Sequence, residues 1–273
     1  MKLYPALDVD SASEVVLALV DDFSPTAVEE GAATMRLFFA VPDARDAACA
    51  ELRARGYRTV PLDVSDEDWA RRSQDGLEPI TIGRITVVPR LPTSDSRSSG
   101  ADSVAPITIV IEPSMGFGTG HHATTRLCLD ALQRADVAGK SVLDVGTGSG
   151  VLAIAADRLG AARALGIDYD ADAVQSARGN ATLNPEAMHT AFALLDLTAS
   201  PLPDADIVTA NLTGALLVTS AAALLAAVRA GGTLILSGIL AEERDLVRQA
   251  FAAAEIIKER DEAEWLCFVL RKR

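Results

Sequence analysis

A strand that runs into closely spaced glycines constrains this chain more than any other feature. Residues 141–150 read Ser-Val-Leu-Asp-Val-Gly-Thr-Gly-Ser-Gly, so an apolar segment ends in glycines at alternate positions. Open α/β sheets bind ligands at the carboxyl ends of their strands, where glycines let a ligand approach the backbone amides that open the next helix. The segment therefore predicts a ligand site at Gly146, Gly148 and Gly150. A tight strand-to-helix turn without a ligand is the alternative.

Alternating helix and strand patterns surround this segment. We expect helices at 124–134, 150–159, 171–180, 216–228 and 242–253, and strands at 141–144, 164–167, 192–195, 207–210, 233–237 and 265–270. Such alternation calls for a mainly parallel sheet covered by helices on both faces. We predict an α/β, Rossmann-like domain over residues 107–273.

The N-terminal residues 1–65 carry a different pattern, in the order strand, helix, strand, strand, helix, strand. Ser11 and Glu14 form a capping box before the first helix, and Gly56 ends the helix predicted at 43–55. This order is typical of a small α+β, ferredoxin-like domain. Residues 66–106 are predicted to link the domains through a short acidic helix at 66–73, a strand at 80–88 and a polar loop at 92–104.

Composition narrows the possible partners. The formal net charge of −13 argues against a general affinity for nucleic acid, which requires a basic surface. The sequence has no apolar run long enough to span a membrane and no signal-peptide core, so we predict a cytoplasmic protein without a membrane partner. Cys49, Cys128 and Cys267 are far apart and are expected to be buried thiols, with no metal site.

The glycine spacing and two carboxylates favour one ligand class. A dinucleotide fingerprint places its third glycine one position later than Gly150. Asp144 would lie close to a diphosphate, whereas it favours the ammonium group of a methionine moiety or water bound to it. Asp168 ends the next strand and can accept hydrogen bonds from both ribose hydroxyls. These residues predict S-adenosylmethionine as the cofactor. For Asp168 the alternative is a cap on the following helix.

Two more candidates follow later strands. Asp196 is placed to accept a hydrogen bond from an adenine amino group, although Asp is common after strands. Asn211 ends the strand at 207–210 on the same edge of the sheet, where its amide oxygen and neighbouring carbonyls could accept hydrogen bonds from an incoming amine. An ordinary loop turn is the alternative for both residues.

Residues 112–125 carry a more specific signal. They read Glu-Pro-Ser-Met-Gly-Phe-Gly-Thr-Gly-His-His-Ala-Thr-Thr. Together with the glycine loop, Asp168 and Asn211-Leu212, this segment resembles the bacterial ribosomal protein L11 methyltransferase family. The likeness extends from about Asp66 to the C-terminus. The chain differs from the family's usual Thr-His-Pro at 121–123 and from its usual Asn-Ile-Leu at 211–213.

The resemblance implies a class I methyltransferase domain joined to a small N-terminal domain that recognises a ribosomal protein, and methylation of amino groups, mainly of lysine side chains. It also implies residue roles. Thr125, Gly146, Asp168 and Asn211 would contact the cofactor, and the loop of Phe117 would shape the channel for the acceptor amine.

These expectations combine into one mechanism. Asn211 and the carbonyl of Leu212 hold the amine in line with the methyl group, and the proton is lost to water. A methyltransferase for another protein's lysines or for a small amine remains an alternative, as does a non-catalytic adenosylmethionine-binding module. His121 and His122 are expected to serve loop packing or acceptor contacts, because adjacent loop residues point apart and no third metal ligand is near.

Overall fold

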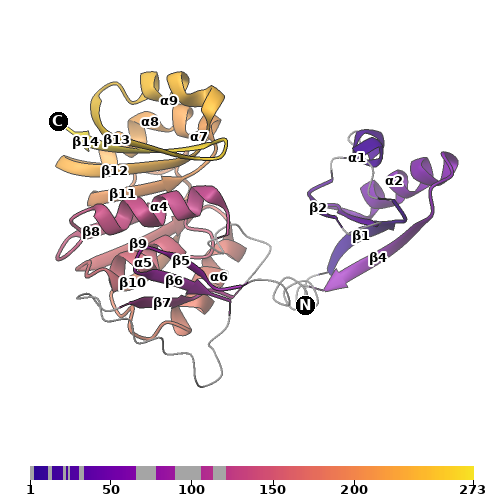
Figure 1. Ribbon diagram of the computed structural model, residues 1–273, viewed down its shortest axis with the longest axis horizontal. Helices are drawn as coiled ribbons and strands as arrows, with labels where there is room; N and C mark the ends of the chain where they lie inside the picture. The colour runs from indigo at the N-terminus through magenta and orange to yellow at the C-terminus, as the bar shows by residue number, and fades with distance from the viewer. Residues whose placement is uncertain are drawn as a thin grey trace. The chain divides into compact units, whose positions relative to one another are not determined.

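The computed structural model describes residues 3–11, 14–20, 23, 25–30, 34–65, 78–89, 106–112 and 121–273. The chain divides into two compact units, Met1–Gly76 and Leu77–Arg273, which are coloured along the chain in Figure 1. The predicted helix at 66–73, the predicted loop at 92–104 and Phe117 lie outside the described residues.

The first unit is a four-stranded antiparallel sheet with two helices. Its elements are β1 (Leu3–Val9), α1 (Glu14–Val20), β2 (Ala27–Glu30), β3 (Met35–Phe38), α2 (Pro42–Ala54) and β4 (Thr59–Ser65). The strand order is β2-β3-β1-β4. Both helices pack on one face, where Leu7, Val16 and Leu52 share a buried cluster. The predicted ferredoxin-like arrangement is confirmed, because this chain order and this sheet order define it.

A small three-stranded sheet opens the second unit. It is made of β5 (Ile80–Ile82), β6 (Ile85–Val88) and β7 (Ile107–Val110), with β6 parallel to β7. The single strand predicted at 80–88 was wrong, because Gly83, at φ +56°, turns the chain into a hairpin. Gln133 fixes that turn by accepting a hydrogen bond from the N–H of Arg84 at 2.9 Å and donating to the carbonyl of Ile82 at 2.9 Å.

The remainder of the second unit forms the large α/β domain. Its elements are α4 (Ala123–Arg134), β8 (Ser141–Val145), α5 (Val151–Arg158), β9 (Arg163–Asp168), α6 (Ala171–Thr182), β10 (Thr190–Leu194), β11 (Ala205–Asn211), α7 (Gly214–Thr219), α8 (Ala221–Ala227), β12 (Val228–Leu240), α9 (Arg244–Ala250), β13 (Ala254–Glu262) and β14 (Trp265–Lys272). The sheet order is β10-β9-β8-β11-β12-β14-β13, parallel as far as β12 and antiparallel at β14 and β13. The predicted mainly parallel sheet is confirmed.

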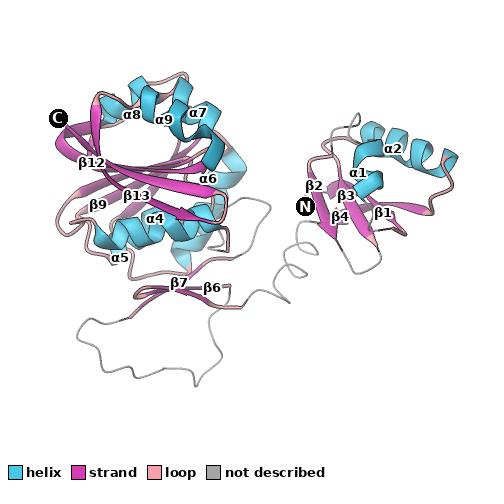
Figure 2. Ribbon diagram, turned by 45° about the horizontal axis from the view of Figure 1, so that its top comes forward, coloured by secondary structure: helices cyan, strands magenta, loops and turns pink. Residues whose placement is uncertain are grey.

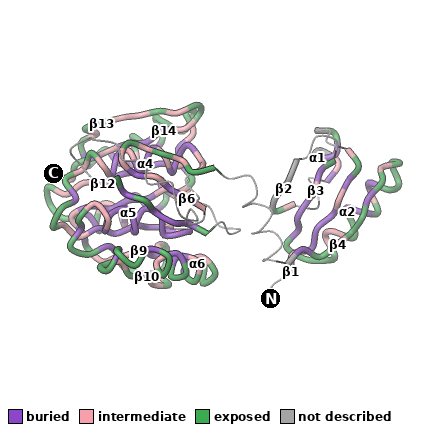
Figure 3. Tube along the Cα trace, turned by 60° about the horizontal axis from the view of Figure 1, so that its bottom comes forward, coloured by how far each residue is buried: buried purple, intermediate pink, exposed green. Residues whose placement is uncertain are grey.

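Helices cover both faces of this sheet, as Figure 2 shows for α4 and α5 against α7, α8 and α9. Successive strand residues point to opposite faces, so Val142 packs into the cluster that contains α4, α5 and α6, whereas Leu143 packs into the cluster that contains α7, α8 and α9. The central strands β8 and β11 are largely buried between the helices, whereas β10 and β13 at the two sides of the sheet are mostly intermediate or exposed (Figure 3). The predicted burial of Cys49, Cys128 and Cys267 as free thiols is also confirmed.

Three predicted boundaries in this domain were wrong. The helix predicted at 216–228 is two helices, α7 and α8, that meet at Ser220. Strand β12 starts at Val228 and is longer than the predicted strand. Strand β13 was not predicted, because its sequence Ala-Glu-Ile-Ile-Lys-Glu-Arg-Asp-Glu is mostly charged. A charged strand is typical of a sheet edge, where one side faces solvent.

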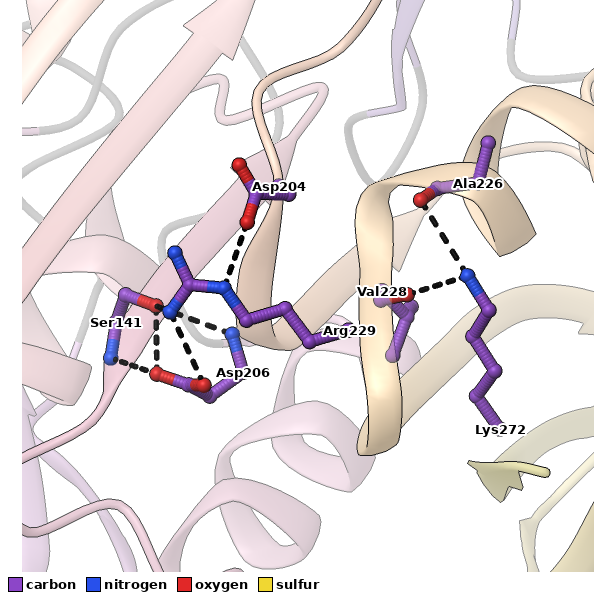
Figure 4. Close-up of polar contacts among 7 residues, drawn as sticks. All are labelled: Ser141, Asp204, Asp206, Ala226, Val228, Arg229 and Lys272. Carbon is purple, nitrogen blue, oxygen red and sulfur yellow. Dashed lines mark hydrogen bonds and ion pairs between the residues drawn. The ribbon is translucent and has the colours of Figure 1, made fainter.

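Polar side chains form hydrogen bonds at the edge of the sheet where the parallel strands begin (Figure 4). Asp206 accepts hydrogen bonds from the N–H and hydroxyl of Ser141 at 2.8 and 2.7 Å, and Arg229 donates to Asp206 at 3.1 Å and to Asp204 at 2.6 Å. The hydrogen bonds from Ser141, with a smaller contribution from Arg229, lower the pKa of Asp206 to about 2. These contacts join β8, β11 and β12 at the edge opposite to the glycine loop. Within the described part of the chain, no helix is long and apolar enough to cross a membrane.

Candidate functional site

The glycine loop connects β8 to α5 at the carboxyl edge of the sheet. Gly146, Gly148 and Gly150 have φ values of +70°, +52° and +83°, a region that L side chains rarely adopt. A Cβ atom at Gly150 would lie 2.8 Å from the ring of Phe192, and one at Gly146 would collide with the side chain of Leu212. Glycine is therefore required here both by backbone conformation and by space, and the absence of side chains lets a ligand lie close to the loop backbone.

Asp168, the last residue of β9, connects this loop to the neighbouring strand. Its Oδ2 accepts a hydrogen bond from the N–H of Gly148 at 3.0 Å, and its Oδ1 accepts one from the N–H of Asp170 at 3.0 Å. The cap of α6 is Asp170, whose side chain accepts from the N–H of Asp172 at 2.9 Å. Because the helix has its own cap, Asp168 is not needed for that purpose. Each carboxylate oxygen accepts up to two hydrogen bonds, so Asp168 retains acceptor sites for a ligand.

Asp144 lies deeper, with 1% of its surface exposed. Its Oδ2 accepts a hydrogen bond from the hydroxyl of Thr147 at 2.7 Å, and its Oδ1 accepts one from the hydroxyl of Thr209 at 2.6 Å. Burial raises the pKa of Asp144 to about 6, and the two hydroxyl hydrogen bonds oppose that shift. The carboxyl group therefore links the glycine loop to β11. Its predicted effect on a methionine ammonium group stays a prediction.

Asn211 ends β11, and Leu212 follows it at the same edge of the sheet. Asn211 is in register with Ser237 of β12, and the N–H of Leu212 donates to the carbonyl of Ser237 at 3.1 Å. A Cβ atom at Gly238, where φ is +82°, would collide with the main chain of Leu212. The main chain of Leu212 thus packs against Gly238 of β12, and the Leu212 side chain lies against Gly146 of the glycine loop.

Thr125 lies in the first turn of α4 and is 2% exposed. Its N–H donates to the carbonyl of His122 at 3.1 Å. The ring of His122 caps the helix, because Nδ1 accepts from the N–H of Thr124 at 3.4 Å. Nδ1 also lies 2.8 Å from the Thr124 hydroxyl, and the ring packs edge-on against Trp265 with the ring centroids 4.9 Å apart. His121 lies with Nε2 3.0 Å from the carbonyl of Glu78. His122 therefore caps the helix, and His121 packs against the backbone at Glu78. Loop packing was one of the two roles that we expected for this pair, and helix capping was not predicted.

Asp196 and Phe117 are the remaining predicted site residues. Asp196 is exposed, and its Oδ1 accepts hydrogen bonds from the hydroxyl and the N–H of Thr198, both at 2.7 Å. These hydrogen bonds hold the pKa of Asp196 below its ordinary value. Phe117 lies outside the described residues. Among the residues with a described placement, no group of three His, Cys, Asp or Glu could hold a metal ion.

The sequence analysis missed three polar residues that organise this edge. Thr147 and Thr209 hold the Asp144 carboxyl group, and Asn180 of α6 donates to the carbonyl of Ser149 in the glycine loop at 2.8 Å. Thr209 lies in an otherwise apolar strand and Asn180 on the buried side of its helix. A single polar residue at a buried position was the available signal, because such a group requires a hydrogen-bond partner.

Comparison with known proteins identifies relatives in one family. The family model for the ribosomal protein L11 methyltransferase, PrmA, matches residues 38–273. A protein of that name from Cupriavidus pinatubonensis is 42% identical over 229 residues, which is 81% of this chain and 73% of the relative. Another from Cupriavidus necator is 39% identical over 259 residues, which is 93% of this chain and 77% of the relative.

A solved structure agrees with the sequence relatives. The crystal structure of a ribosomal protein L11 methylase from Lactobacillus delbrueckii subsp. bulgaricus superposes with a TM-score of 0.64 at 28% sequence identity. The similar region covers 72% of this chain and 100% of that chain.

Proposed function

The chain belongs to the ribosomal protein L11 methyltransferase family, and we propose that it is an S-adenosylmethionine-dependent enzyme that methylates amino groups of ribosomal protein L11, mainly on lysine side chains. The observation that carries this proposal is the glycine loop with Asp168 at the end of the adjacent strand, joined by the hydrogen bond from Gly148. That pair combines a backbone that a ligand can approach closely with a carboxylate acceptor, which suits an adenosine with a methionine tail.

The residues at the sheet edge fit this cofactor. Asp168 would accept hydrogen bonds from the ribose hydroxyls, and Gly146, Gly148 and Gly150 would allow the methionine portion to lie against the backbone. Asp144, which is bonded to Thr147 of the loop, is proposed to favour the ammonium group through its negative charge. Thr125 and Asp196 are proposed to complete the cofactor site, with Asp196 nearest to the adenine.

Adenosylmethionine supplies a methyl group that is already activated by its sulfonium, so the protein needs to position the acceptor and remove its charge. A lysine side chain with an ordinary pKa of about 10.4 costs about 5 kcal/mol to deprotonate at pH 7. An apolar channel lowers that cost by disfavouring the ammonium form. We assign the channel wall to the loop of Phe117.

Asn211 and Leu212 are proposed to hold the amine. The side-chain amide of Asn211 and the carbonyl of Leu212 both offer oxygen acceptors to the amine hydrogens. The backbone there is enclosed by β12 through Ser237 and Gly238. Such fixed acceptors orient the nitrogen lone pair toward the methyl group, and the proton is released to water before transfer.

The N-terminal unit is proposed to recognise the ribosomal substrate, as the family resemblance implies. A ribosomal substrate also favours a cytoplasmic enzyme. The role of the unit is separable from catalysis, because it is a compact body with its own buried cluster around Leu7 and Leu52.

Methyl transfer to purified ribosomal protein L11 tests this function. The full chain is incubated with isotope-labelled adenosylmethionine and the protein substrate, and intact-mass spectrometry then counts the added methyl groups. We expect mass increases in multiples of one methyl group on lysine or terminal amines. Label that enters another protein of a cell lysate, or a small amine, would assign the alternative substrate. Cofactor binding without any transfer would identify a non-catalytic module.

A further inference from the structure

The buried amide of Asn180 joins the glycine loop to the segment that follows β7. Asn180 belongs to α6 and is 2% exposed. Its Nδ2 donates to the carbonyl of Ser149 at 2.8 Å, and its Oδ1 accepts from the N–H of Glu112 at 2.8 Å. One side chain therefore fixes two backbone segments that are far apart in sequence.

The polarity of its two partners requires an amide at this position. The N–H of Glu112 can only donate, and the carbonyl of Ser149 can only accept, so the oxygen and nitrogen of Asn180 have an unambiguous orientation. A carboxylate of the same shape would satisfy Glu112 but would face the Ser149 carbonyl with a second acceptor. An apolar side chain would satisfy neither partner, and the contact with the Ser149 carbonyl lies in a buried region.

The bond to Ser149 controls the shape of the glycine loop. The Ser149 carbonyl belongs to the peptide group whose N–H, on Gly150, donates to the carbonyl of Thr147 at 2.8 Å. Rotation of that peptide group would break the turn and redirect the amides that precede α5. Asn180 opposes this rotation through Ser149, and Asp168 separately holds Gly148.

The bond to Glu112 lies just before the segment that is proposed to form the channel wall. The sequence motif Gly116-Phe117-Gly118-Thr119-Gly120 begins only a few residues after Glu112. The N–H of Ile111, just before it, donates to the carbonyl of Val88 at 2.9 Å. The chain thus leaves β7 from a fixed point, and Asn180 sets the distance between that point and the glycine loop.

We propose that Asn180 is a positioning residue for cofactor binding, which acts by holding the glycine loop in its binding conformation relative to Glu112. This inference rests on the proposed function, since it concerns the same cofactor site. Asn180 itself is covered by the loop and is not assigned a contact with the cofactor.

Asn184 provides a matched control. It is also 2% exposed and lies one helical turn after Asn180. Its amide accepts from the N–H of Val110 at 2.8 Å and donates to the carbonyl of Val110 at 2.7 Å. It also donates to the carbonyl of Asn180 at 2.7 Å. Asn184 therefore anchors β7 through a buried amide, and among the described residues its side-chain hydrogen bonds do not involve the glycine loop.

The test compares Asn180→Asp and Asn180→Ala with Asn184→Asp and Asn184→Ala. The dissociation constant of S-adenosylhomocysteine is measured by calorimetry, and the melting temperature by fluorescence. We expect the Asn180 variants to bind at least about tenfold more weakly, because the Ser149 contact is lost. We expect the Asn184 variants to remain within about threefold of the unmodified protein at a similar loss of melting temperature.

Two results separate the possible failures. If the Asn180 and Asn184 variants lower the melting temperature alike and affect binding alike, Asn180 has only a structural role and the inference is wrong. If the unmodified protein does not bind S-adenosylhomocysteine, the proposed function is wrong instead. If the alanine variants fail to fold, the affinities of the isosteric Asn180→Asp and Asn184→Asp variants for S-adenosylhomocysteine are compared instead. Equal affinities would show that the inference is wrong.

Discussion

The backbone N–H of Gly148 donates to the carboxylate of Asp168 across 3.0 Å, which connects the glycine loop to the end of the neighbouring strand. The two groups lie on adjacent parallel strands, β8 and β9, whose carboxyl ends meet at one edge of the sheet. The contact gives the loop and the carboxylate a fixed separation before any ligand arrives. A preorganised site of this kind binds without a large ordering cost.

Replacement of Asp168 by alanine should weaken binding of S-adenosylhomocysteine about 100-fold, because two hydrogen bonds to a charged acceptor are lost at about 1.5 kcal/mol each. Calorimetry measures the change. Asp170→Ala is the control, since it removes the cap of α6 and should lower the free energy of unfolding by about 1 kcal/mol with little effect on affinity. Equal losses of affinity in both variants would contradict the assignment.

Gly146 and Gly139 offer a test of the space around the loop. Their φ values are +70° and +73°, so alanine should cost each site about 1 kcal/mol of unfolding free energy from backbone strain. A Cβ atom at Gly146 would collide with Leu212, whereas one at Gly139 meets nothing within 4 Å. We therefore expect only Gly146→Ala to lose cofactor affinity as well. Binding that is unchanged in Gly146→Ala would show that the loop conformation is not needed.

Asn211→Ala should lower kcat about 100-fold while the cofactor affinity changes much less, because the amine loses an acceptor that orients it for transfer. Steady-state kinetics with the ribosomal substrate, together with calorimetry on the cofactor, separates these effects. Thr213→Ala is a suitable control, since Thr213 is the N-cap of α7 but makes no side-chain capping hydrogen bond. Unchanged turnover in Asn211→Ala would remove that residue from the mechanism.

The Asp144 carboxyl group should make stability depend on pH. Its pKa is about 6 in the folded protein against 3.8 for an ordinary carboxyl, so the folded state binds the proton more tightly than the unfolded chain. The resulting stability is fully present below pH 4 and is lost as the pH rises through 6, with about 1 kcal/mol lost between pH 5 and 7. Asp144→Asn should abolish this component in urea unfolding. If the free energy of unfolding changes equally between pH 5 and 7 in the variant and the unmodified protein, Asp144 does not titrate in this range.

Asp206 should act in the opposite direction at the other edge of the sheet. Its pKa of about 2 lies below the ordinary value, so its contribution to stability is present above pH 4 and is lost as the pH falls through 2. Because the side chain is 33% exposed, we expect about 1 kcal/mol after allowance for solvent screening. The free energy of unfolding of the Asp206→Asn variant should be lower than that of the unmodified protein by this amount at pH 7, and by less near pH 3. A deficit that grows in acid would contradict the account.

Much of the fold followed from periodicity and capping signals in the sequence. The alternation of helix and strand patterns after Ala123 predicted the mainly parallel sheet. The helical pattern that ends before Gly56 predicted α2 of the N-terminal unit. Strand β13 escaped prediction because an edge strand needs little apolar patterning. The break at Ser220 was equally hidden, because the apolar residues on its two sides continue in one alanine-rich run.

Candidate site residues could be predicted where their proposed role depends only on residues close to them in the sequence. The glycine spacing and the placement of Asp168 after a strand required no partner to be known. The roles of Thr209 and Asn180 depend on groups that lie far away in the chain, so no spacing rule could reveal them. Asp170 shows the same limit, because either of two nearby acidic residues could have capped α6 until the hydrogen bonds were seen.

The most direct test of the central claim is a calorimetric titration of the full chain with S-adenosylhomocysteine and, separately, with a nicotinamide dinucleotide. We expect saturable binding of one S-adenosylhomocysteine per chain, weakened by Asp168→Ala, and no binding of the dinucleotide. Saturable uptake of the dinucleotide together with no response to S-adenosylhomocysteine would contradict it.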